Sequence, residues 1–312
     1  MGTPHFATEP LKALLNNNFE ITAVVTAPDR ATGRGLKTTP SDVKVFAESK
    51  GIPVLQPESL KESSFISALK QLDAEIFVVV AFRMLPEIVW SIPSKGTFNL
   101  HASLLPQYRG AAPINHAIIN GETKTGVTTF MIDHNIDTGA ILFQEECEIG
   151  EQETAGELHD KLMKIGASLV VKTAMAISEG NLTPTLQSSL LKSNDTLKTA
   201  PKLSKECGRI VWEKDCTDIY NLIRGLSPYP AAHSVLTAVD KTIPVKIFGS
   251  HPDLQHNTLK PGEIESDNKS YLRVGCKKGS LLLKSIQAAG KKRLSIREFL
   301  AGTRDIATFR FI

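Results

Sequence analysis

Short apolar runs alternate with amphipathic segments along the first two-thirds of the chain. Residues 21–26 (ITAVVT) and 75–82 (EIFVVVAF) are rich in β-branched side chains, as parallel strands buried on both faces require. Between them, residues 41–51 predict a helix that Ser41 caps and Gly51 ends. Such an alternation of strands and helices is typical of a parallel or mostly parallel sheet covered by helices.

The same alternation continues to residue 179. Its apolar patterns predict strands over residues 96–101, 126–133 and 140–148, and helices over residues 63–72, 111–120 and 155–179. Residues 1–4 (MGTP) are typical of a turn from a strand to a helix, and residues 6–15 predict that helix, but no apolar strand precedes the turn. We therefore expect an α/β fold with a doubly wound, Rossmann-like sheet whose first strand is missing from this chain.

The last third of the chain has a different pattern. Residues 180–207 are polar, rich in Ser, Thr and Lys, and weakly periodic, which predicts a linker. After a short helical pattern at 218–224, short strand patterns separated by turn signals follow at residues 232–239, 245–248, 262–265, 271–276 and 280–286. They predict a small OB-like β-barrel. The expected domains are thus an α/β domain over 1–188, a linker over 189–206 and a C-terminal barrel over 207–312.

Composition narrows the class of protein. A chain of 312 residues with 41% apolar residues suits two packed globular domains. Its four cysteines are scattered and form no CxxC pair, which favours reduced thiols in a cytoplasmic protein over a disulfide framework or a structural zinc site. The longest apolar run, residues 76–82, is too short to span a bilayer, and no signal peptide pattern opens the chain. We expect no bound metal and no membrane partner.

Charge is distributed unequally between the two parts. Residues 201–312 hold 19 Lys and Arg against 11 Asp and Glu, a balance of +8, whereas residues 1–200 have a balance of −5. A basic domain joined to an acidic one indicates a polyanionic partner for the basic part, although an ordinary solvated surface gives the same counts.

Candidate chemistry is concentrated at residues 98–113. Asn99 and His101 are two residues apart on an expected strand, so their side chains project from one face, where an amide donor and a titratable imidazole can act together. Asp137 ends a later strand in a polar loop closed by Gly139 and could bring a carboxylate to His101. Taken singly, an Asn-x-His pair on a strand is more often hydrogen-bonded scaffolding than a catalytic pair, and Asp137-Thr138-Gly139 is also typical of a simple turn.

Together the residues resemble a known family. The stretch Asn99-x-His101-x-Ser103-Leu-Leu-Pro106, followed about thirty residues later by Asp137, is similar to the folate-dependent formyltransferases. Within that family, members that act on initiator tRNA carry longer stretches similar to residues 1–4, 78–82, 98–113, 224–232 and 298–302. The resemblance covers nearly the whole chain, including the small second domain.

This resemblance implies direct transfer of a formyl group from 10-formyltetrahydrofolate, a co-substrate, to a primary amine without a covalent enzyme intermediate. Asn99 is expected to donate a hydrogen bond to the oxyanion, His101 to stabilise that oxyanion or take the proton of the amine, and Asp137 to orient His101. The resemblance also assigns tetrahydrofolate contacts to Ser103, Leu104, Leu105, Pro106, Phe82 and Leu85.

The amine is implied to be the methionine of aminoacylated initiator tRNA. Residues 27–44 form a long basic loop, and long loops in compact domains are usually functional or disordered. The resemblance implies that this loop enters the tRNA acceptor end, where an arginine can pair with phosphates and stack on a base, and that the barrel holds the backbone. The tRNA-binding candidates are Arg30, Arg34, Lys37, Lys44, Lys291, Lys292, Arg293 and Arg297, in an enzyme expected to be monomeric.

Two other functions stay open. A formyltransferase that modifies a small amine, such as glycinamide ribonucleotide or an amino-sugar nucleotide, would use the same folate and the same three residues but would need neither the basic loop nor the basic barrel. A non-catalytic RNA-binding protein would need the barrel alone, and the presence of Asn99, His101 and Asp137 argues against it.

Overall fold

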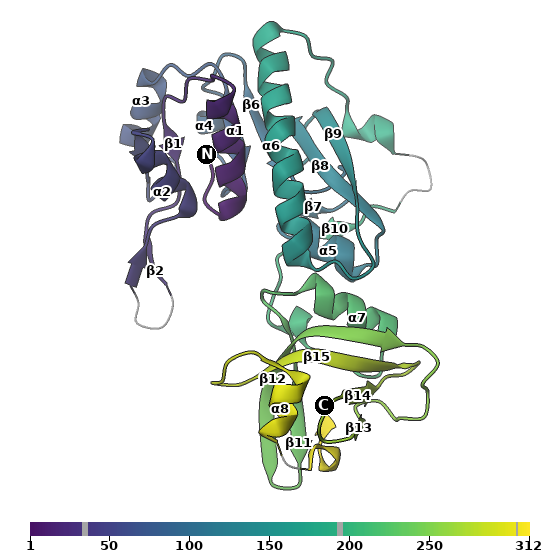
Figure 1. The fold of residues 1–312 in the computed structure, drawn as a ribbon. Helices are drawn as coiled ribbons and strands as arrows, with labels where there is room; N and C mark the ends of the chain where they lie inside the picture. The colour runs from purple at the N-terminus through teal and green to yellow at the C-terminus, as the bar shows by residue number, and fades with distance from the viewer. Residues whose placement is uncertain (33–36, 192–195, 304) are drawn as a thin grey trace. The chain divides into compact units, whose positions relative to one another are not determined.

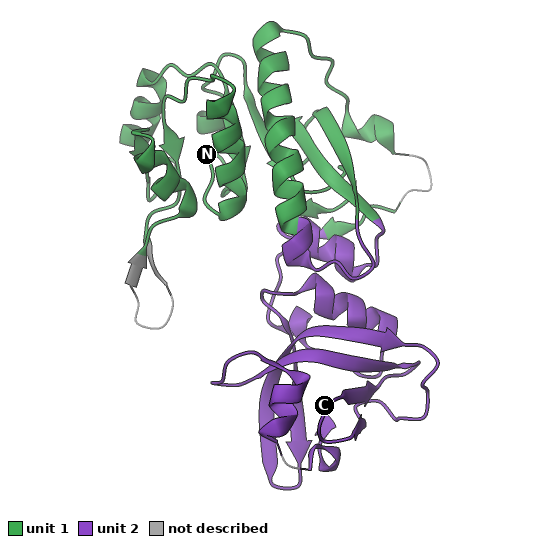
Figure 2. Cartoon of the chain, viewed as in Figure 1, with its two compact units in different colours: residues 1–110, 124–148, 159–199 green, residues 111–123, 149–158, 200–312 purple. Residues whose placement is uncertain are grey.

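The computed structural model describes residues 1–32, 37–191, 196–303 and 305–312 (Figure 1). The chain divides into two compact units, which Figure 2 shows in separate colours. Unit 1 contains residues 1–110, 124–148 and 159–199, and unit 2 contains residues 111–123, 149–158 and 200–312. Two short stretches from the middle of the chain therefore belong to the unit that holds the C-terminal third.

Unit 1 is built around two short sheets. In the first, β1 (Val24–Val25) pairs in parallel with β4 (Val54–Leu55). The second has the order β5-β6-β8-β9, with β5 (Phe77–Val80) parallel to β6 (Thr97–His101). The last two strands, β8 (Lys124–Met131) and β9 (Ile141–Glu148), are antiparallel. The expected parallel pairing is thus confirmed between β5 and β6. At the other end of the sheet, the consecutive strands β8 and β9 form a hairpin, a connection that is open to antiparallel strands only.

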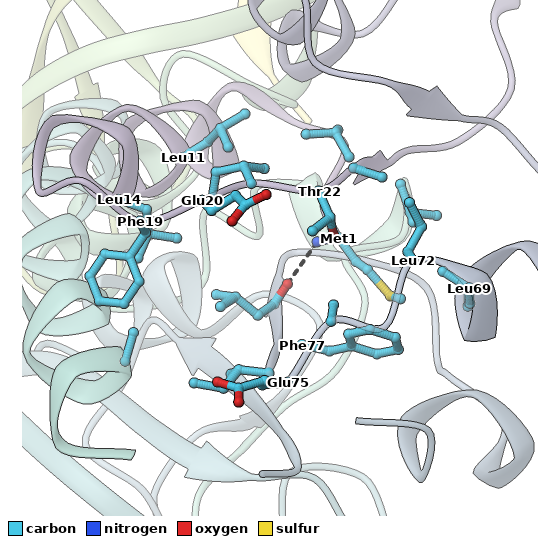
Figure 3. Close-up of a pocket in the computed structure, with 18 of the residues that line it drawn as sticks. Met1, Leu11, Leu14, Phe19, Glu20, Thr22, Leu69, Leu72, Glu75 and Phe77 are labelled. Carbon is cyan, nitrogen blue, oxygen red and sulfur yellow. Dashed lines mark hydrogen bonds between the residues drawn. The ribbon is translucent and has the colours of Figure 1, made fainter. Parts of the chain in front are cut away.

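Met1 and Gly2 lie between these two sheets. The Gly2 amide donates to the Val25 carbonyl (3.0 Å), and the Val80 amide donates to the Met1 carbonyl (2.9 Å). A cavity of about 400 Å³ adjoins Met1 (Figure 3), and residues 19–23 line it without joining a strand. The strand expected over 21–26 is therefore shortened to Val24–Val25, because a cavity rather than a neighbouring strand lies beside its first half.

The lining of this cavity is mainly apolar. Leu11 and Leu14 come from α1 (Thr8–Asn16), and Leu69 comes from α3 (Ser63–Gln71). The Met1 amine is buried beside them and donates to the Val78 carbonyl at 2.7 Å (Figure 3). Burial lowers the pKa of this amine from 8.0 to about 5, because a positive charge there would lose its hydration.

Helices cover both sheets of unit 1. The expected cap is confirmed in α2 (Asp42–Ser49), where the Ser41 hydroxyl accepts from the Lys44 amide (3.2 Å). Helix α6 (Ala155–Glu179) has the predicted bounds, and its Gly166 lies so close to Leu100 that a Cβ there would be 2.7 Å from the leucine side chain. Leu100 thus faces α6, which leaves its neighbours on β6 on the opposite face.

Unit 2 contains the predicted antiparallel barrel. Its strands have the order β13-β14-β15-β12-β11-β17, with β16 paired to β15, and a bridge between Glu263 and Arg310 links the two ends. The barrel is therefore nearly closed. Its strands are β11 (Ala232–Ala238), β12 (Lys241–Asp253), β13 (Ile264–Ser266), β14 (Leu272–Gly275), β15 (Ser280–Ala288), β16 (Leu294–Ser295) and β17 (Arg310–Phe311).

The core of unit 2 joins the barrel to a helix. Helix α7 (Cys216–Gly225) places Ile219 and Ile223 against fully buried barrel residues such as Leu236 and Ile247. Helix α5 (Pro113–Ile119) packs on α7, and the Asn115 side chain donates to the Gly225 carbonyl at 2.7 Å. This packing explains why residues 111–123 cluster with unit 2 although they lie far earlier in the sequence.

Candidate active site

Strand β6 positions the two polar side chains that the sequence singles out. It is hydrogen-bonded on both sides, with Asn99 opposite Val79 of β5 and Phe130 of β8. Since Leu100 faces α6, Asn99 and His101 project from the other face of the sheet. Asn99 is partly exposed on that face, whereas His101 is buried. The strand alternation expected from the sequence is therefore present at these residues.

Two neighbours hold the His101 imidazole. Its Nε2 lies 2.9 Å from the Tyr108 carbonyl, and its Nδ1 lies 3.7 Å from Oδ2 of Asp137. A carbonyl only accepts, so the hydrogen of the neutral ring belongs on Nε2 and the lone pair on Nδ1. Nδ1 is then available to take a proton, and the imidazolium so formed would pair with the adjacent carboxylate.

Asp137 reaches His101 because the loop over residues 132–140 folds back across the same face of the sheet. The Ile132 amide donates to the Thr97 carbonyl (2.9 Å) at the start of β6, and five residues later Asp137 lies at the end of that strand. The Asp137 carboxylate accepts from the Gly110 amide (2.9 Å), and its backbone is left-handed, with φ 55°. The structure thus places the Asp137 carboxylate beside the His101 imidazole, on the face of the sheet from which Asn99 also projects.

The segment of residues 103–106 follows His101 and is fixed by side chains of the neighbouring hairpin. The Thr128 hydroxyl donates to the Ser103 carbonyl (2.6 Å), and the Gln144 amide donates to the Leu105 carbonyl (2.9 Å). Ser103, Leu105 and Pro106 are buried, and only Leu104 is partly exposed. Three of these four folate candidates therefore offer mainly backbone atoms to a ligand, while their buried side chains fix the conformation of the segment.

The other folate candidates lie just after β5. Because β5 and β6 are parallel, their carboxyl ends lie at one edge of the sheet, so residues 81–86 and 102–106 leave it side by side. Leu85 is buried and Phe82 is partly exposed. Between and after them, Met84 and Ile88 expose 75% and 52% of their surface, although they are large and apolar. Exposed apolar side chains beside irregular backbone fit a flat heterocycle with polar edges.

Contacts link this segment to the loop that carries Asp137. The Trp90 and His134 rings meet edge to face, with centroids 5.3 Å apart, and Nδ1 of His134 lies 3.7 Å from a Glu87 carboxylate oxygen. Trp90 and Glu87 belong to α4 (Glu87–Trp90). Helix α4, which follows the candidate folate segment, therefore contacts the candidate catalytic loop within unit 1.

The basic candidates fall into two groups, one in each unit. Arg30 belongs to β2 (Arg30–Thr32) and Lys37 to β3 (Lys37–Thr39), which pair as an antiparallel hairpin, and Arg34 lies outside the described residues. The Lys44 ammonium lies 2.6 Å from the Asp29 carboxylate. The hydrogen bond between them raises the pKa of Lys44 and lowers that of Asp29. The charge of Lys44 is therefore already paired inside unit 1.

In unit 2 the basic candidates lie at the turn after β15 and at the start of α8 (Ile296–Ala301). Lys291, Lys292 and Arg297 are exposed. The Arg293 guanidinium lies 4.5 Å from the centroid of the Phe248 ring and donates to the Ser285 hydroxyl (3.0 Å). Stacking on an aromatic ring holds this arginine at the barrel surface with its charge intact.

Several residues of the site have no functional signal in the sequence. The Tyr108 carbonyl and the Gly110 amide contact His101 and Asp137 through backbone atoms, which any residue type could supply. Gln187 hydrogen-bonds to the Asp137 loop from a stretch whose polar composition predicts a linker. Only the position of residues 108–110 within the candidate stretch 98–113 could have indicated their importance.

Neither a membrane-spanning helix nor a metal-binding cluster of side chains is present among the described residues. Among the residues that the structure describes, none of the helices combines the length and the apolar character that crossing a bilayer needs. Within residues 1–32, 37–191, 196–303 and 305–312, no group of three or more His, Cys, Asp or Glu side chains is arranged to hold a metal ion.

An α/β unit that gathers a carboxamide, an imidazole and a carboxylate on one face of its sheet, joined to a small β-barrel, is the architecture of the formyl transferases. The chain belongs to this family: residues 1–174 match the formyl transferase domain, and residues 202–304 match the formyl transferase C-terminal domain. Both expected parts of the resemblance are thereby confirmed at the level of the family.

Curated relatives are more specific. The methionyl-tRNA formyltransferase of Parabacteroides distasonis is 47% identical over 99% of this chain and 96% of its own length. That of Flavobacterium johnsoniae is also 47% identical, over 97% of this chain and 94% of its own length. Among solved structures, the N-formyltransferase from Helicobacter canadensis, in complex with folinic acid and dTDP-3-aminofucose, shares the fold with a TM-score of 0.64 at 20% identity, covering 94% of this chain and 97% of that one.

Proposed function

We propose that this chain transfers the formyl group of 10-formyltetrahydrofolate to the amino group of methionine on initiator tRNA. The observation that carries the proposal is the 47% sequence identity to a methionyl-tRNA formyltransferase over 99% of this chain. The matched region includes the barrel as well as the α/β unit. The sugar N-formyltransferases are similar at about 20% identity. The proposal includes a monomeric enzyme in the cytoplasm, where aminoacylated tRNA is found.

The reaction exchanges one C–N bond for another. The neutral amine of methionine attacks the formyl carbon, a tetrahedral oxyanion forms, and the bond to N10 of the folate breaks as N10 takes a proton. Asn99 would donate to the oxyanion, a role worth about 3 kcal/mol where a single donor has been removed in other enzymes. Its partly exposed side chain on the catalytic face supports this role.

His101 and Asp137 would move the proton. The free lone pair on Nδ1, inferred from the contact of Nε2 with the Tyr108 carbonyl, can accept the proton that the attacking amine loses. The Asp137 carboxylate, 3.7 Å away, would stabilise the imidazolium until the proton passes to N10. One oriented base can thus serve both the attack and the departure of the leaving group.

The formyl donor would lie along the sheet edge formed by the carboxyl ends of β5 and β6. We assign its contacts to Phe82 and Leu85 after β5, and to Ser103, Leu104, Leu105 and Pro106 after β6. Exposed apolar side chains at Met84 and Ile88 support a cover for the pterin ring there. The HypX protein from Aquifex aeolicus, solved with tetrahydrofolic acid, has the same fold, with a TM-score of 0.57 at 19% identity.

The tRNA would contact both units. We assign its acceptor end to the loop that carries Arg30, Arg34, Lys37 and Lys44, and its phosphate backbone to Lys291, Lys292, Arg293 and Arg297. Exposure of the basic side chains at the barrel turn supports the second assignment. The pairing of Lys44 with Asp29 supports a role for that lysine in holding the base of the loop rather than in binding phosphate by itself.

A turnover assay tests the proposal. The protein is incubated with 10-formyltetrahydrofolate and either methionyl-initiator tRNA or dTDP-3-amino sugars, and the formylated products are separated and counted. We expect formylmethionyl-tRNA and no formylated sugar, with activity that falls steeply as salt is raised from 50 to 200 mM, because phosphate contacts are screened. Formylation of the sugars without formylation of the tRNA would replace this proposal with the small-amine alternative, and formylation of neither substrate would contradict the proposal.

A further inference from the structure

Gln187 is buried in a stretch of chain that is otherwise exposed. It begins the short helix η2 (Gln187–Leu190), and only 3% of its surface is exposed. The other residues from 183 to 190 are all exposed. A carboxamide gains little from burial as such, so its position must depend on the hydrogen bonds that it makes.

Those hydrogen bonds use the full capacity of the side chain. Nε2 donates to the carbonyls of Asp137 and Gly139, each at 2.9 Å. Oε1 accepts from Nε and Nη2 of Arg109, at 3.0 and 2.7 Å. A carboxamide has two N–H donors and one oxygen with two lone pairs, so each of them has a partner here.

The two segments that Gln187 joins are the ones that hold the catalytic pair. Arg109 lies in β7 (Arg109–Gly110), between the Tyr108 carbonyl that contacts His101 and the Gly110 amide that contacts Asp137. On the other side, Asp137 itself has φ 55°, a conformation that an L residue keeps only when its surroundings enforce it. Gln187 binds the carbonyl of that residue directly.

We propose that Gln187 is a positioning residue for formyl transfer, which acts through Asp137. It links the left-handed turn at Asp137 to the guanidinium of Arg109, so that the Asp137 carboxylate stays beside Nδ1 of His101. This inference rests on the proposed function for its kinetic consequence, while the geometry of the pair can be measured independently.

Two variants distinguish the hydrogen bonds that Gln187 accepts from Arg109 from those that it donates to the Asp137 loop. Gln187→Glu keeps an acceptor for Arg109 but loses both donors to the Asp137 and Gly139 carbonyls. Gln187→Leu loses all four hydrogen bonds. We expect kcat for methionyl-tRNA to fall about 10- to 100-fold in both variants with KM changed by less than about threefold, because the defect lies in the orientation of a charge.

A double-mutant cycle tests whether Gln187 acts through Asp137. In an Asp137→Asn background, where the carboxylate charge is already absent, Gln187→Leu should lower kcat by less than about twofold further. Ile223→Val in the core of unit 2 serves as a stability control, since it weakens packing without touching the site. Gln71→Leu, at an exposed position on α3, controls for the substitution type.

Crystal structures of the wild type and of Gln187→Leu test the same inference without any substrate. We expect the separation of Asp137 Oδ2 and His101 Nδ1 to increase by about 1 Å or more in the variant. An unchanged separation, a kcat within about twofold of wild type in both Gln187 variants, or an equal loss with and without Asp137 would each overturn the positioning role. If the wild type itself fails to formylate methionyl-tRNA while the separation still increases in the variant, the proposed function fails and the positioning role stands.

Discussion

Two buried regions of unit 1 differ in almost every respect. Around His101 and Asp137, polar groups converge: the Tyr108 carbonyl contacts the imidazole, and the Gly110 amide donates to the carboxylate. Around Met1 there is a mainly apolar cavity of about 400 Å³ with one buried amine. None of the residues that line the cavity belongs to the polar cluster. The cavity beside Met1 is therefore separate from the candidate catalytic site.

The difference shows that oriented polar groups, rather than cavity volume, indicate a catalytic site. Catalysis of acyl transfer needs oriented donors and a base, and these lie where backbone and side chains fix one another around His101. The lining of the cavity is mainly apolar, and these apolar walls resemble an incompletely filled core. Substitutions in the first region should therefore change turnover, and those in the second should change stability.

The largest expected effect is on turnover. His101→Ala removes the base beside Asp137, and we expect kcat to fall about 10²- to 10⁴-fold with the melting temperature nearly unchanged. Formylation kinetics and thermal unfolding measure the two quantities. His256→Ala is the control, because that imidazole belongs to unit 2 and pairs there with Glu265. Turnover near the wild-type rate would remove His101 from the catalytic assignment.

The second prediction concerns the Met1 amine and pH. Its pKa is about 5 in the folded chain and 8.0 as an ordinary amine, so between these pH values the unfolded chain binds more protons. The free energy of unfolding should therefore increase as the pH rises from 5 to 8, by up to about 4 kcal/mol from this group.

Urea denaturation at pH 5, 6.5 and 8 measures this dependence. Protein acetylated on the Met1 nitrogen is the matched control, since it cannot be protonated there and the adjoining cavity leaves room for the acetyl group. The difference in slope between the two forms isolates the amine from the histidines, which titrate in both. Equal slopes would show that burial does not depress the pKa of this amine.

The third prediction tests how closely the polar region is packed. A Cβ on Gly139 would lie 1.7 Å from the Met131 carbonyl oxygen, so Gly139→Ala must displace the loop that carries Asp137. We expect a loss of stability of about 3 kcal/mol together with reduced turnover. Gly302→Ala is the control, because the nearest atoms there are 3.8 Å away. Equal urea midpoints for the two variants would contradict the close packing.

The smallest expected effect is a gain in stability at the cavity. Ala174 lies on α6, is 2% exposed and lines the cavity, so Ala174→Leu should fill part of it and stabilise the protein by about 1 kcal/mol without changing kcat. Ala167→Leu on the same helix is the control: it is buried away from the cavity and should destabilise by overpacking. A loss of stability in both variants would mean that the cavity cannot accept a larger side chain.

The amino-acid order alone predicts the elements whose formation depends on local periodicity. Helix α6 has the predicted bounds, the barrel strands β11 to β15 lie at predicted strand patterns, and Asn99 and His101 share a face because side chains alternate along any strand. The short strands β16 and β17 had no predicted pattern. The amino-acid order also indicates the family, since the spacing of Asn99, His101 and Asp137 resembles that of known formyltransferases. By contrast, the strand expected over 21–26 is mostly absent, because a strand also needs a neighbour.

The surroundings of the candidate catalytic pair follow from the tertiary fold alone. The partners of His101 and Asp137 are the Tyr108 carbonyl and the Gly110 amide, and backbone groups are the same in every residue type. Gln187 reaches the site across fifty residues of chain from Asp137, from a stretch whose composition predicts a linker. Local sequence fixes which side chains are available, whereas the contacts that orient them depend on which distant segments the fold brings together.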